Sequence, residues 1–160
     1  MRRIKLTQGK YTLVSTIDFE YLNQWKWYAR KQRSTWYAVR DIWIPVHKIL
    51  YMHRLIHNRL YFNTQMQTDH KDQNGLNNQR NNLRVATNTE NNRNKKKQRN
   101  NTSGYKGVYW SNQGHKWFVQ ICVNKRLIYL GYFTEKLEAA KVYNKAAKKY
   151  FGEFAYLNPV

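Results

Sequence analysis

Acidic residues are scarce in this chain of 160 residues, because Asp and Glu together number 9 against 29 Lys and Arg. The resulting formal charge of +20 would repel itself in so short a chain unless a polyanion neutralised it. Nucleic acid is such a polyanion, and it binds basic proteins through counterion release at its phosphates. The charge therefore favours a nucleic-acid partner, and it leaves open an anionic membrane surface or a ribosome-like structural role.

Cysteine and long apolar segments are also scarce. The single cysteine, Cys122, excludes a disulfide framework and a multi-cysteine zinc site. Neither a secretory hydrophobic region nor an apolar run of about 18 residues occurs, so we expect a soluble, cytoplasmic protein with no membrane partner. Aromatic residues, by contrast, make up 16% of the chain, which is too much apolar surface for a disordered basic tail. We therefore expect a folded, basic protein.

The N-terminal third has the composition of a β-rich module, which we assign to residues 1–50. β-branched and aromatic residues bounded by polar turns predict strands at 11–14, 25–29 and 36–40. A short helix is expected at 18–22. Apolar residues at helical spacing predict a further helix over 48–57.

The middle of the chain is rich in asparagine. Eleven of the 28 residues from Asn74 to Asn101 are Asn, a composition that favours turns and is also compatible with a plain linker. Five positive charges fall in the seven positions 93–99, and such a block should stay extended until it meets phosphates. We therefore assign a basic linker to residues 96–102. The cations expected to hold DNA in this region are Arg93, Lys95, Lys96, Lys97 and Arg99.

Residues of quite different chemistry interrupt the Asn-rich stretch. The chain reads TDHKDQNG at 68–75, NNLR at 81–84 and TNTEN at 87–91. The carboxylate of Asp69 is a hard oxygen ligand that suits magnesium or manganese. His70 beside it can accept a proton near neutral pH. This pairing indicates metal-assisted acid–base chemistry.

A helix is expected directly after this block. Thr87 and Glu90 have the spacing of a capping box, which marks the start of a helix. Asn91 would then lie in the first turn and could offer a side-chain oxygen to the metal on Asp69, with Asn92 as its direct rival. The predicted layout is strand, loop, strand and helix, with oxygen ligands at both ends.

This order of residues resembles the ββα-metal motif of the HNH nucleases, and we assign that module to residues 51–95. Asp69 and His70 resemble the first signature of the family, Asn82 its central Asn, and Asn91 its third position. The resemblance implies hydrolysis of a phosphodiester bond, with His70 as general base and Asn82 orienting the imidazole. It also implies one magnesium or manganese ion per active site, held by Asp69 and Asn91.

Each of these residues also has a simpler interpretation. Asp69 could merely initiate a turn, and Asn82 could be one more Asn of a biased segment. His53, in an upstream MHRLI segment that also resembles this family, could pack in the core, contact phosphate or bind metal. For the whole chain, the main alternative is a non-catalytic DNA-binding regulator with a degenerate HNH motif. A third is a basic RNA-binding or structural protein.

Residues 103–160 predict a three-stranded antiparallel sheet packed on one helix. Apolar residues alternate along the predicted strands, and Asn124-Lys125 falls where a two-residue hairpin turn belongs. Gly131 is expected to end the last strand, and Thr134 to cap the helix. The residues that repeat on one helical face, and should meet the sheet, are Ala139, Tyr143, Ala146 and Tyr150.

The segments YKGV, YLGYF, EAA and LN, in that order, resemble the DNA-binding domain of plant ethylene-response factors (the Apetala-two type). In that family the sheet face opposite the helix lies in the major groove of DNA. Placing Gln120 opposite Tyr129 puts Val119 opposite Leu130 and turns Val119 toward the helix. The residues then expected on the DNA face are Lys106 and Tyr109 from the first strand, and Lys116, Phe118, Gln120 and Tyr129. The plant domains carry arginines at several of these positions, and this chain mostly does not.

Together these features predict an α+β protein with a β-rich N-terminal module, a central ββα-metal motif and a C-terminal sheet with one helix. A cutting module followed by a sheet-type reader resembles the HNH homing endonucleases of phages and mobile introns. The resemblance implies a metal-dependent endonuclease acting on double-stranded DNA. One active site per chain predicts a nick by a monomer, and no protein partner is implied.

Overall fold

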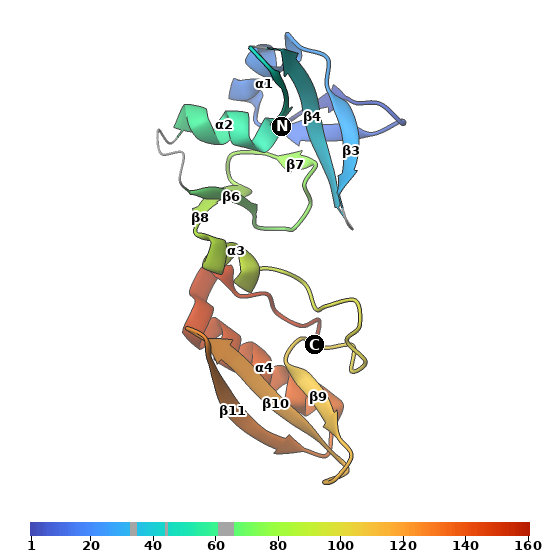
Figure 1. Cartoon of the computed structure of the whole chain (residues 1–160), viewed down its shortest axis with the longest axis vertical. Coiled ribbons are helices and arrows are strands. Elements are labelled where there is room, and N and C mark those ends of the chain that lie inside the picture. The colour runs from blue at the N-terminus through green and yellow to red at the C-terminus, as the bar shows by residue number, and fades with distance from the viewer. Residues whose placement is uncertain (33–34, 44, 61–65) are drawn as a thin grey trace. The chain divides into compact units, whose positions relative to one another are not determined.

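The computed structural model describes the chain except for residues 33–34, 44 and 61–65, and except for the side chains of 59 and 60. The described chain divides into two compact units, Met1–Thr89 and Glu90–Val160 (Figure 1). Each unit combines small sheets with helices, which confirms the expected α+β class. Among the described residues, no helix is long and apolar enough to cross a membrane.

Short strands in the first unit form three sheets. Their bounds are β1 (Arg2–Lys5), β2 (Tyr11–Val14) and β7 (Asn77–Asn78) in one sheet; β3 (Tyr28–Gln32), β4 (Thr35–Trp43) and β5 (His47–Tyr51) in the second; and β6 (Gln67–His70) with β8 (Leu83–Ala86) in the third. The first sheet joins distant parts of the chain, because β7 runs parallel to β2 and places Asn78 opposite Val14. The N-terminal strands are therefore part of the support of the Asn-rich segment.

Among the described residues, three helices accompany these sheets: α1 (Thr16–Asn23), α2 (Met52–Leu60) and α3 (Asn88–Arg93), the last of which runs into the second unit. α1 confirms the short helix predicted at 18–22. The helix predicted over 48–57 is wrong in its first part, because the chain up to Tyr51 pairs with β4 as strand β5. The strand predicted at 25–29 is also wrong in its first part. Trp27 is buried there, and its indole N–H donates a hydrogen bond of 2.8 Å to the Leu22 carbonyl near the end of α1.

The core of the first unit draws on both the β-rich segment and the nuclease-like segment. Val14, Leu22 and Met52 are fully buried, and Leu83 at the start of β8 packs in the same cluster. Burial of such side chains stabilises the fold by roughly 1.5–3 kcal/mol each. The strands that carry the candidate site therefore share one hydrophobic core with the N-terminal strands.

The second unit confirms the predicted three-stranded antiparallel sheet packed on one helix. Its elements are β9 (Val108–Ser111), β10 (Lys116–Val123), β11 (Arg126–Phe133), α4 (Lys136–Phe151) and a short 3-10 turn, η1 (Gly152–Phe154). The predicted hairpin turn is confirmed, because Val123 pairs with Arg126 and the two residues between them, Asn124 and Lys125, have φ values of 50° and 66°. Positive φ at both central residues matches the twist of a two-residue hairpin.

Three local expectations for this unit are wrong. β11 does not end at Gly131 but continues to Phe133 through a β-bulge, so Val119 lies opposite Gly131 rather than Leu130. The residue that caps α4 is Glu135 rather than Thr134. Tyr150 is 36% exposed, because the buried face of α4 continues from Ala147 to Phe151 one turn later.

Candidate active site

The β6–β8 ladder positions the Asp-His pair. Asp69 lies opposite Arg84 and His70 lies opposite Leu83 in this two-stranded sheet. Neighbouring side chains of a strand point to opposite faces, so the carboxylate and the imidazole have different surroundings. Both side chains are nevertheless buried, with exposed fractions of 5% for Asp69 and 7% for His70. The strand therefore presents two ionisable groups in a largely desolvated setting.

The carboxylate of Asp69 forms a buried ion pair with Arg84. The Nε and terminal amino groups of Arg84 donate to Oδ2 of Asp69 over 2.8 and 2.6 Å. Removing either partner of a buried pair leaves an uncompensated charge, which is strongly destabilising. Sequence reasoning missed Arg84. The available signal was a single basic residue inside the otherwise apolar strand LRVA.

A chain of buried hydrogen bonds orients the imidazole of His70. The Thr12 hydroxyl donates to the Leu76 carbonyl over 2.8 Å, so its oxygen is the acceptor for the Asn78 amide N–H, also at 2.8 Å. This arrangement turns Oδ1 of Asn78 toward His70, where it lies 3.0 Å from Nε2. Because a carbonyl oxygen only accepts, Nε2 carries the ring proton and the lone pair of neutral His70 lies on Nδ1.

The expected role of Asn82 is therefore corrected. Its side chain does not hold the imidazole, because Oδ1 accepts from the Asp72 backbone N–H at 3.1 Å and Nδ2 donates to the Asp72 carboxylate and the Asn77 carbonyl at 2.9 and 2.8 Å. Asn82 precedes β8 and points into the loop that connects the two strands. It fastens this loop, and the loop in turn carries Asn78, the residue that contacts His70.

Two further contacts fix the same loop. Arg80 forms a bidentate ion pair with the fully buried Asp18 of α1, with both N–O distances at 2.7 Å. Gly75 lies so close to β4 that an added Cβ would stand 2.4 Å from the Trp36 carbonyl oxygen and 2.7 Å from the Tyr37 ring. Only glycine fits this approach. The loop is thus held by contacts from the N-terminal elements on two sides.

Aromatic and imidazole rings surround His70. The ring centres of His53 and Tyr37 lie 5.0 and 6.1 Å from that of His70. Burial lowers the pKa of His70 from its ordinary value, and the hydrogen bond to Asn78 and the charges of Asp72 and Asp69 oppose this only in part. The pKa of His53 lies well below its ordinary value, mainly because the ring is buried and secondly because His70 is close to it. Both rings are therefore neutral near pH 7, the form in which His70 can accept a proton.

The Asp69 carboxylate is an oxygen ligand of the kind that magnesium and manganese prefer. Among the described residues, no group of three or more His, Cys, Asp or Glu side chains could hold a metal ion together. Magnesium is commonly bound by one or two carboxylates, with waters and substrate phosphate oxygens completing its shell. The Asp69 carboxylate fits that chemistry, although Arg84 engages its Oδ2.

The two candidate second ligands lie in α3. Asn91 falls in the fourth position of this helix and within the second unit, so its cooperation with Asp69 stays a prediction. The side-chain oxygen of its rival Asn92 accepts a hydrogen bond from the Lys95 ammonium. At the other end of the helix, Asn88 accepts from Gln67 of β6 over 2.6 Å. The beginning of α3 is therefore tied to the strand that carries Asp69.

A known protein is similar to this chain over most of its length. The chain is similar to an uncharacterised HNH endonuclease of Acanthamoeba polyphaga mimivirus. The two are 28% identical over 154 residues, which cover 96% of this chain and 77% of that protein. No family model matches the chain, and no solved structure matches it. A distant relative that bears the HNH name thus supports a nuclease function, and the likeness extends over both units.

The second unit places five of the six residues predicted for the DNA face on one face of its sheet. The sheet face that points away from α4 carries Tyr109, Lys116, Phe118, Gln120 and Tyr129. Sequence reasoning missed Tyr132. It joins this face only because of the β-bulge, and the isolated Gly131 inside the strand is the local signal that could have indicated it.

Lys106 does not lie on the first strand as expected but in the turn before β9. Its ammonium donates to the carbonyl oxygens of Arg93 and Lys95, both at 2.7 Å. Burial is the main cause that lowers the pKa of Lys106 to about 8, and the positive charge of Lys95 is the second cause. Arg93 likewise packs within the unit, with its guanidinium 4.8 Å from the Phe151 ring centre. The first part of the basic segment is therefore anchored rather than extended.

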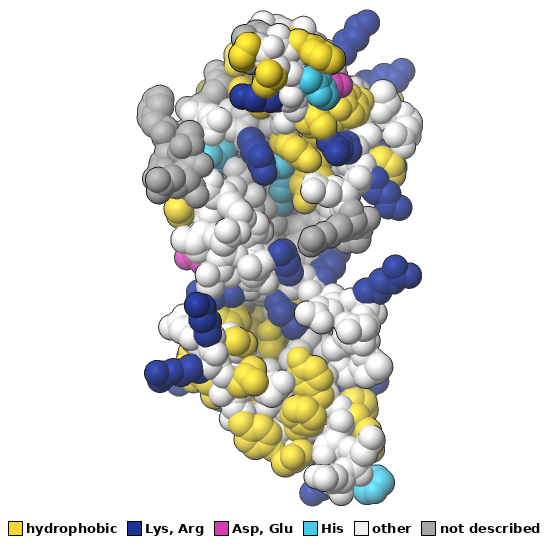
Figure 2. Space-filling view, viewed as in Figure 1, with side chains coloured by type: hydrophobic (Ala, Val, Ile, Leu, Met, Phe, Trp, Pro, Cys, Tyr) yellow, Lys and Arg dark blue, Asp and Glu magenta, His cyan; other side chains and the backbone are white. Residues whose placement is uncertain are grey.

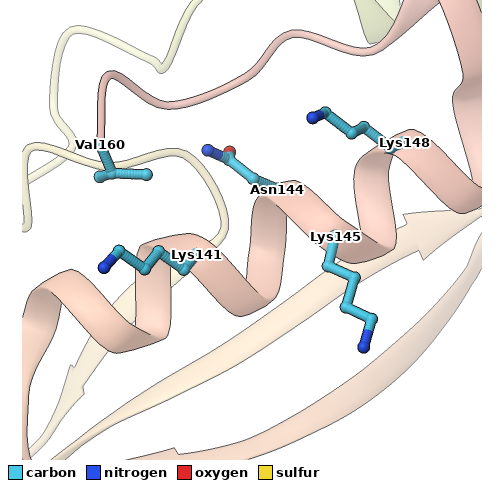
Figure 3. Close-up of a pocket in the computed structure, with 5 residues that line it drawn as sticks. All are labelled: Lys141, Asn144, Lys145, Lys148 and Val160. Atoms are coloured by element: carbon cyan, nitrogen blue, oxygen red, sulfur yellow. The ribbon is translucent and has the colours of Figure 1, made fainter.

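A shallow hollow of about 300 Å³ lies on α4 (Figure 3). Its lining residues are Lys141, Asn144, Lys145, Lys148 and Val160. Asn144 is engaged there by the main chain of Asn158, at 2.7 and 2.9 Å. The side chains that line this hollow include three lysines but no carboxylate or imidazole, so the hollow suits contact with phosphates and not bond cleavage.

Proposed function

We propose that this protein is a metal-dependent HNH endonuclease that hydrolyses phosphodiester bonds in double-stranded DNA and nicks one strand at a time. The observation that carries the proposal is the Asn78–His70 hydrogen bond beside Asp69, within a strand–loop–strand–helix arrangement. It supplies a neutral imidazole with a defined proton-accepting nitrogen, adjacent to an oxygen ligand. The resemblance to phage- and intron-type homing endonucleases adds that cutting is directed to a site.

In this mechanism, Nδ1 of His70 takes a proton from the attacking water. The Asn78 carbonyl holds the ring while the imidazole becomes charged, and the nearby carboxylates of Asp69 and Asp72 stabilise that charge. Asp69, with Asn91 as proposed second ligand, would hold one magnesium or manganese ion. When bound, such an ion would supply positive charge to the phosphate and to the leaving oxygen. The basic segment and the α4 lysines neutralise backbone phosphates.

The Arg84–Asp69 ion pair favours one second candidate, a DNA-binding regulator without catalysis. In such a protein Arg84 would permanently replace the metal as the partner of Asp69. The two functions differ in one respect that can be measured. A nuclease must bind a divalent cation at Asp69 and cut, whereas a regulator must bind DNA and do neither.

Incubation of supercoiled plasmid with the protein and magnesium or manganese separates these functions. We expect nicked circles from the wild type and none from His70→Asn or Asp69→Asn. His115→Asn and Asp41→Asn are matched controls, because these residues are exposed and lie in other parts of the chain, and both should cut normally. Tight binding of duplex DNA by a wild type that nicks no substrate would establish the regulator instead.

A further inference from the structure

The sheet of the second unit exposes a row of aromatic rings. Tyr109, Phe118 and Tyr132 lie directly opposite one another across the three strands, and Tyr129 lies beside Tyr132. The ring centres are 5.2 Å apart for Tyr109–Phe118, 6.3 Å for Phe118–Tyr132 and 5.4 Å for Tyr129–Tyr132. We call these four residues the aromatic row.

A single irregularity of β11 creates this row. Residues 129 and 132 are three positions apart, so in a regular strand they would point to opposite faces. The bulge at Leu130, with Gly131 at a φ of 124°, restores Tyr132 to the face of Tyr129. Gly131 tolerates this conformation because it has no Cβ. Bulges that re-aim a side chain commonly occur next to functional surfaces.

Three of the four rings are exposed to solvent. Tyr109, Tyr129 and Tyr132 are 41%, 55% and 56% exposed, and Phe118 between them is half-buried. Figure 2 shows hydrophobic side chains gathered over the strands of this unit. Exposed apolar patches with polar surroundings commonly mark interaction sites.

The charge of the unit identifies the class of partner. Residues 90–160 contain 14 Lys and Arg but only 4 Glu and no Asp. An apolar protein partner gains nothing from such an excess of positive charge, whereas a nucleic acid does. Aromatic rings on a basic surface are the arrangement that stacks on the flat faces of bases.

The chemistry of the face favours unpaired bases over a duplex. Reading the edges of base pairs in a groove requires Arg, Lys, Asn or Gln side chains, and among the described residues of these strands the face carries only Lys116 and Gln120 of these types. Stacking, in contrast, requires that the base has left its helix, and every base then offers a π-face. The rings of the aromatic row can therefore stack on unpaired bases, but they lack the polar groups that read base-pair edges in a groove.

We propose that the aromatic row binds single-stranded DNA by stacking on its unpaired bases. The proposal rests on the proposed function only in taking DNA as the nucleic acid. It departs from the duplex-reading role that the resemblance to the plant domains implies. The test uses the full chain in EDTA, and measures binding of labelled oligo-dT of about 15 nucleotides, a length near the site size of such modules.

Substitution at the two most exposed rings gives the decisive comparison. We expect Tyr129→Ala and Tyr132→Ala each to weaken oligo-dT binding by roughly 5- to 150-fold, because each loses one stacked base. Tyr129→Phe and Tyr132→Phe keep the ring and should bind like the wild type. Tyr150→Ala removes an exposed tyrosine from α4 and serves as the matched control. The losses should be equal at low and high salt, since stacking releases no counterions.

Three results would overturn the proposal. The first is oligo-dT binding at the wild-type level by both Ala variants. The second is an equal loss of binding for oligo-dT and for a duplex of the same length, and the third is tighter binding of oligo-rU than of oligo-dT. A plasmid-nicking assay on the same proteins keeps the two proposals distinct. If the wild type nicks plasmid but the Ala variants bind oligo-dT normally, only the proposal for the aromatic row is refuted. If oligo-dT binding depends on the rings but the wild type does not nick, only the nuclease proposal is refuted.

Discussion

The hydrogen bond between Asn78 and His70 allows a directional test of the catalytic arrangement. Asn78→Ala removes the acceptor of the imidazole N–H, and Asn78→Asp retains an acceptor at the same place but adds a negative charge. Neither substitution touches DNA in the proposed mechanism, so both should change kcat and leave KM nearly unchanged. Asn78 is fully buried, and its side chain spans the 3.0 Å to His70 and the 2.8 Å to Thr12.

The magnitude follows from the contacts that are lost. Asn78→Ala leaves a buried N–H without its acceptor, which costs about 1–3 kcal/mol. If this cost adds in full to the activation free energy of cleavage, kcat decreases by roughly 5- to 150-fold. A general base contributes roughly 100- to 10,000-fold in all, so the loss must remain smaller than that of His70→Asn. The same 1–3 kcal/mol should appear as lowered stability in a denaturant titration.

The pH dependence has opposite signs in the two variants. The hydrogen bond to Asn78 raises the pKa of His70 against the larger effect of burial. Its loss in Asn78→Ala therefore lowers this pKa further, and the acid limb of the rate profile moves to lower pH. The carboxylate in Asn78→Asp stabilises the imidazolium, and the limb moves to higher pH.

The assay is single-turnover nicking of plasmid from pH 5 to 8, with Asn81→Ala as an exposed control from the same loop. Shifts of the limb in the same direction for Asn78→Ala and Asn78→Asp would refute the reasoning. So would a wild-type rate for a correctly folded Asn78→Ala. Opposite shifts in the Ala and Asp variants of Asn82, without shifts at Asn78, would restore Asn82 as the orienting residue.

Three further predictions concern other contacts. Arg84→Gln removes the cation from Asp69, so it should tighten manganese binding measured by calorimetry and lower the unfolding temperature; weaker manganese binding would contradict a metal role for Asp69. Arg80→Ala unpairs the buried Asp18 and should destabilise the first unit by about 3–5 kcal/mol, while an Arg80→Lys variant that retains the charge loses less; equal unfolding curves would contradict this. Lys106→Met should destabilise the second unit by about 1–3 kcal/mol without changing the salt dependence of DNA binding. Because the folded pKa of about 8 lies below the unfolded value of 10.5, the unfolded state holds more protons between these values, and wild-type stability should rise relative to Lys106→Met as the pH increases from 8 to 10.5.

Local sequence signals predicted the elements whose causes are local. The strand at Tyr11–Val14, the hairpin turn at Asn124-Lys125 and the helix that begins after Thr87 depend on side-chain alternation, turn residues and capping within a few positions. The Asp69–His70 pair was recognisable for the same reason, since its two chemistries are adjacent in the chain. Where a distant segment competed, local signals gave the wrong result. Residues 48–51 have helical spacing but pair with β4, because a strand partner was available.

The sequence alone thus established the basic character of the chain and its α+β class, and it singled out the Asp69–His70 pair as the candidate site. It did not distinguish Asn78 from Asn82, because two asparagines four positions apart have the same chemistry. The parallel pairing of β7 with β2 makes that choice, since it brings Asn78 to Thr12 and His70 and leaves Asn82 in the loop. The β6–β8 register likewise brings Arg84 onto Asp69, and the β11 bulge brings Tyr132 beside Tyr129. These contacts join residues that are far apart in the chain or out of phase along it, so only the tertiary structure decides them.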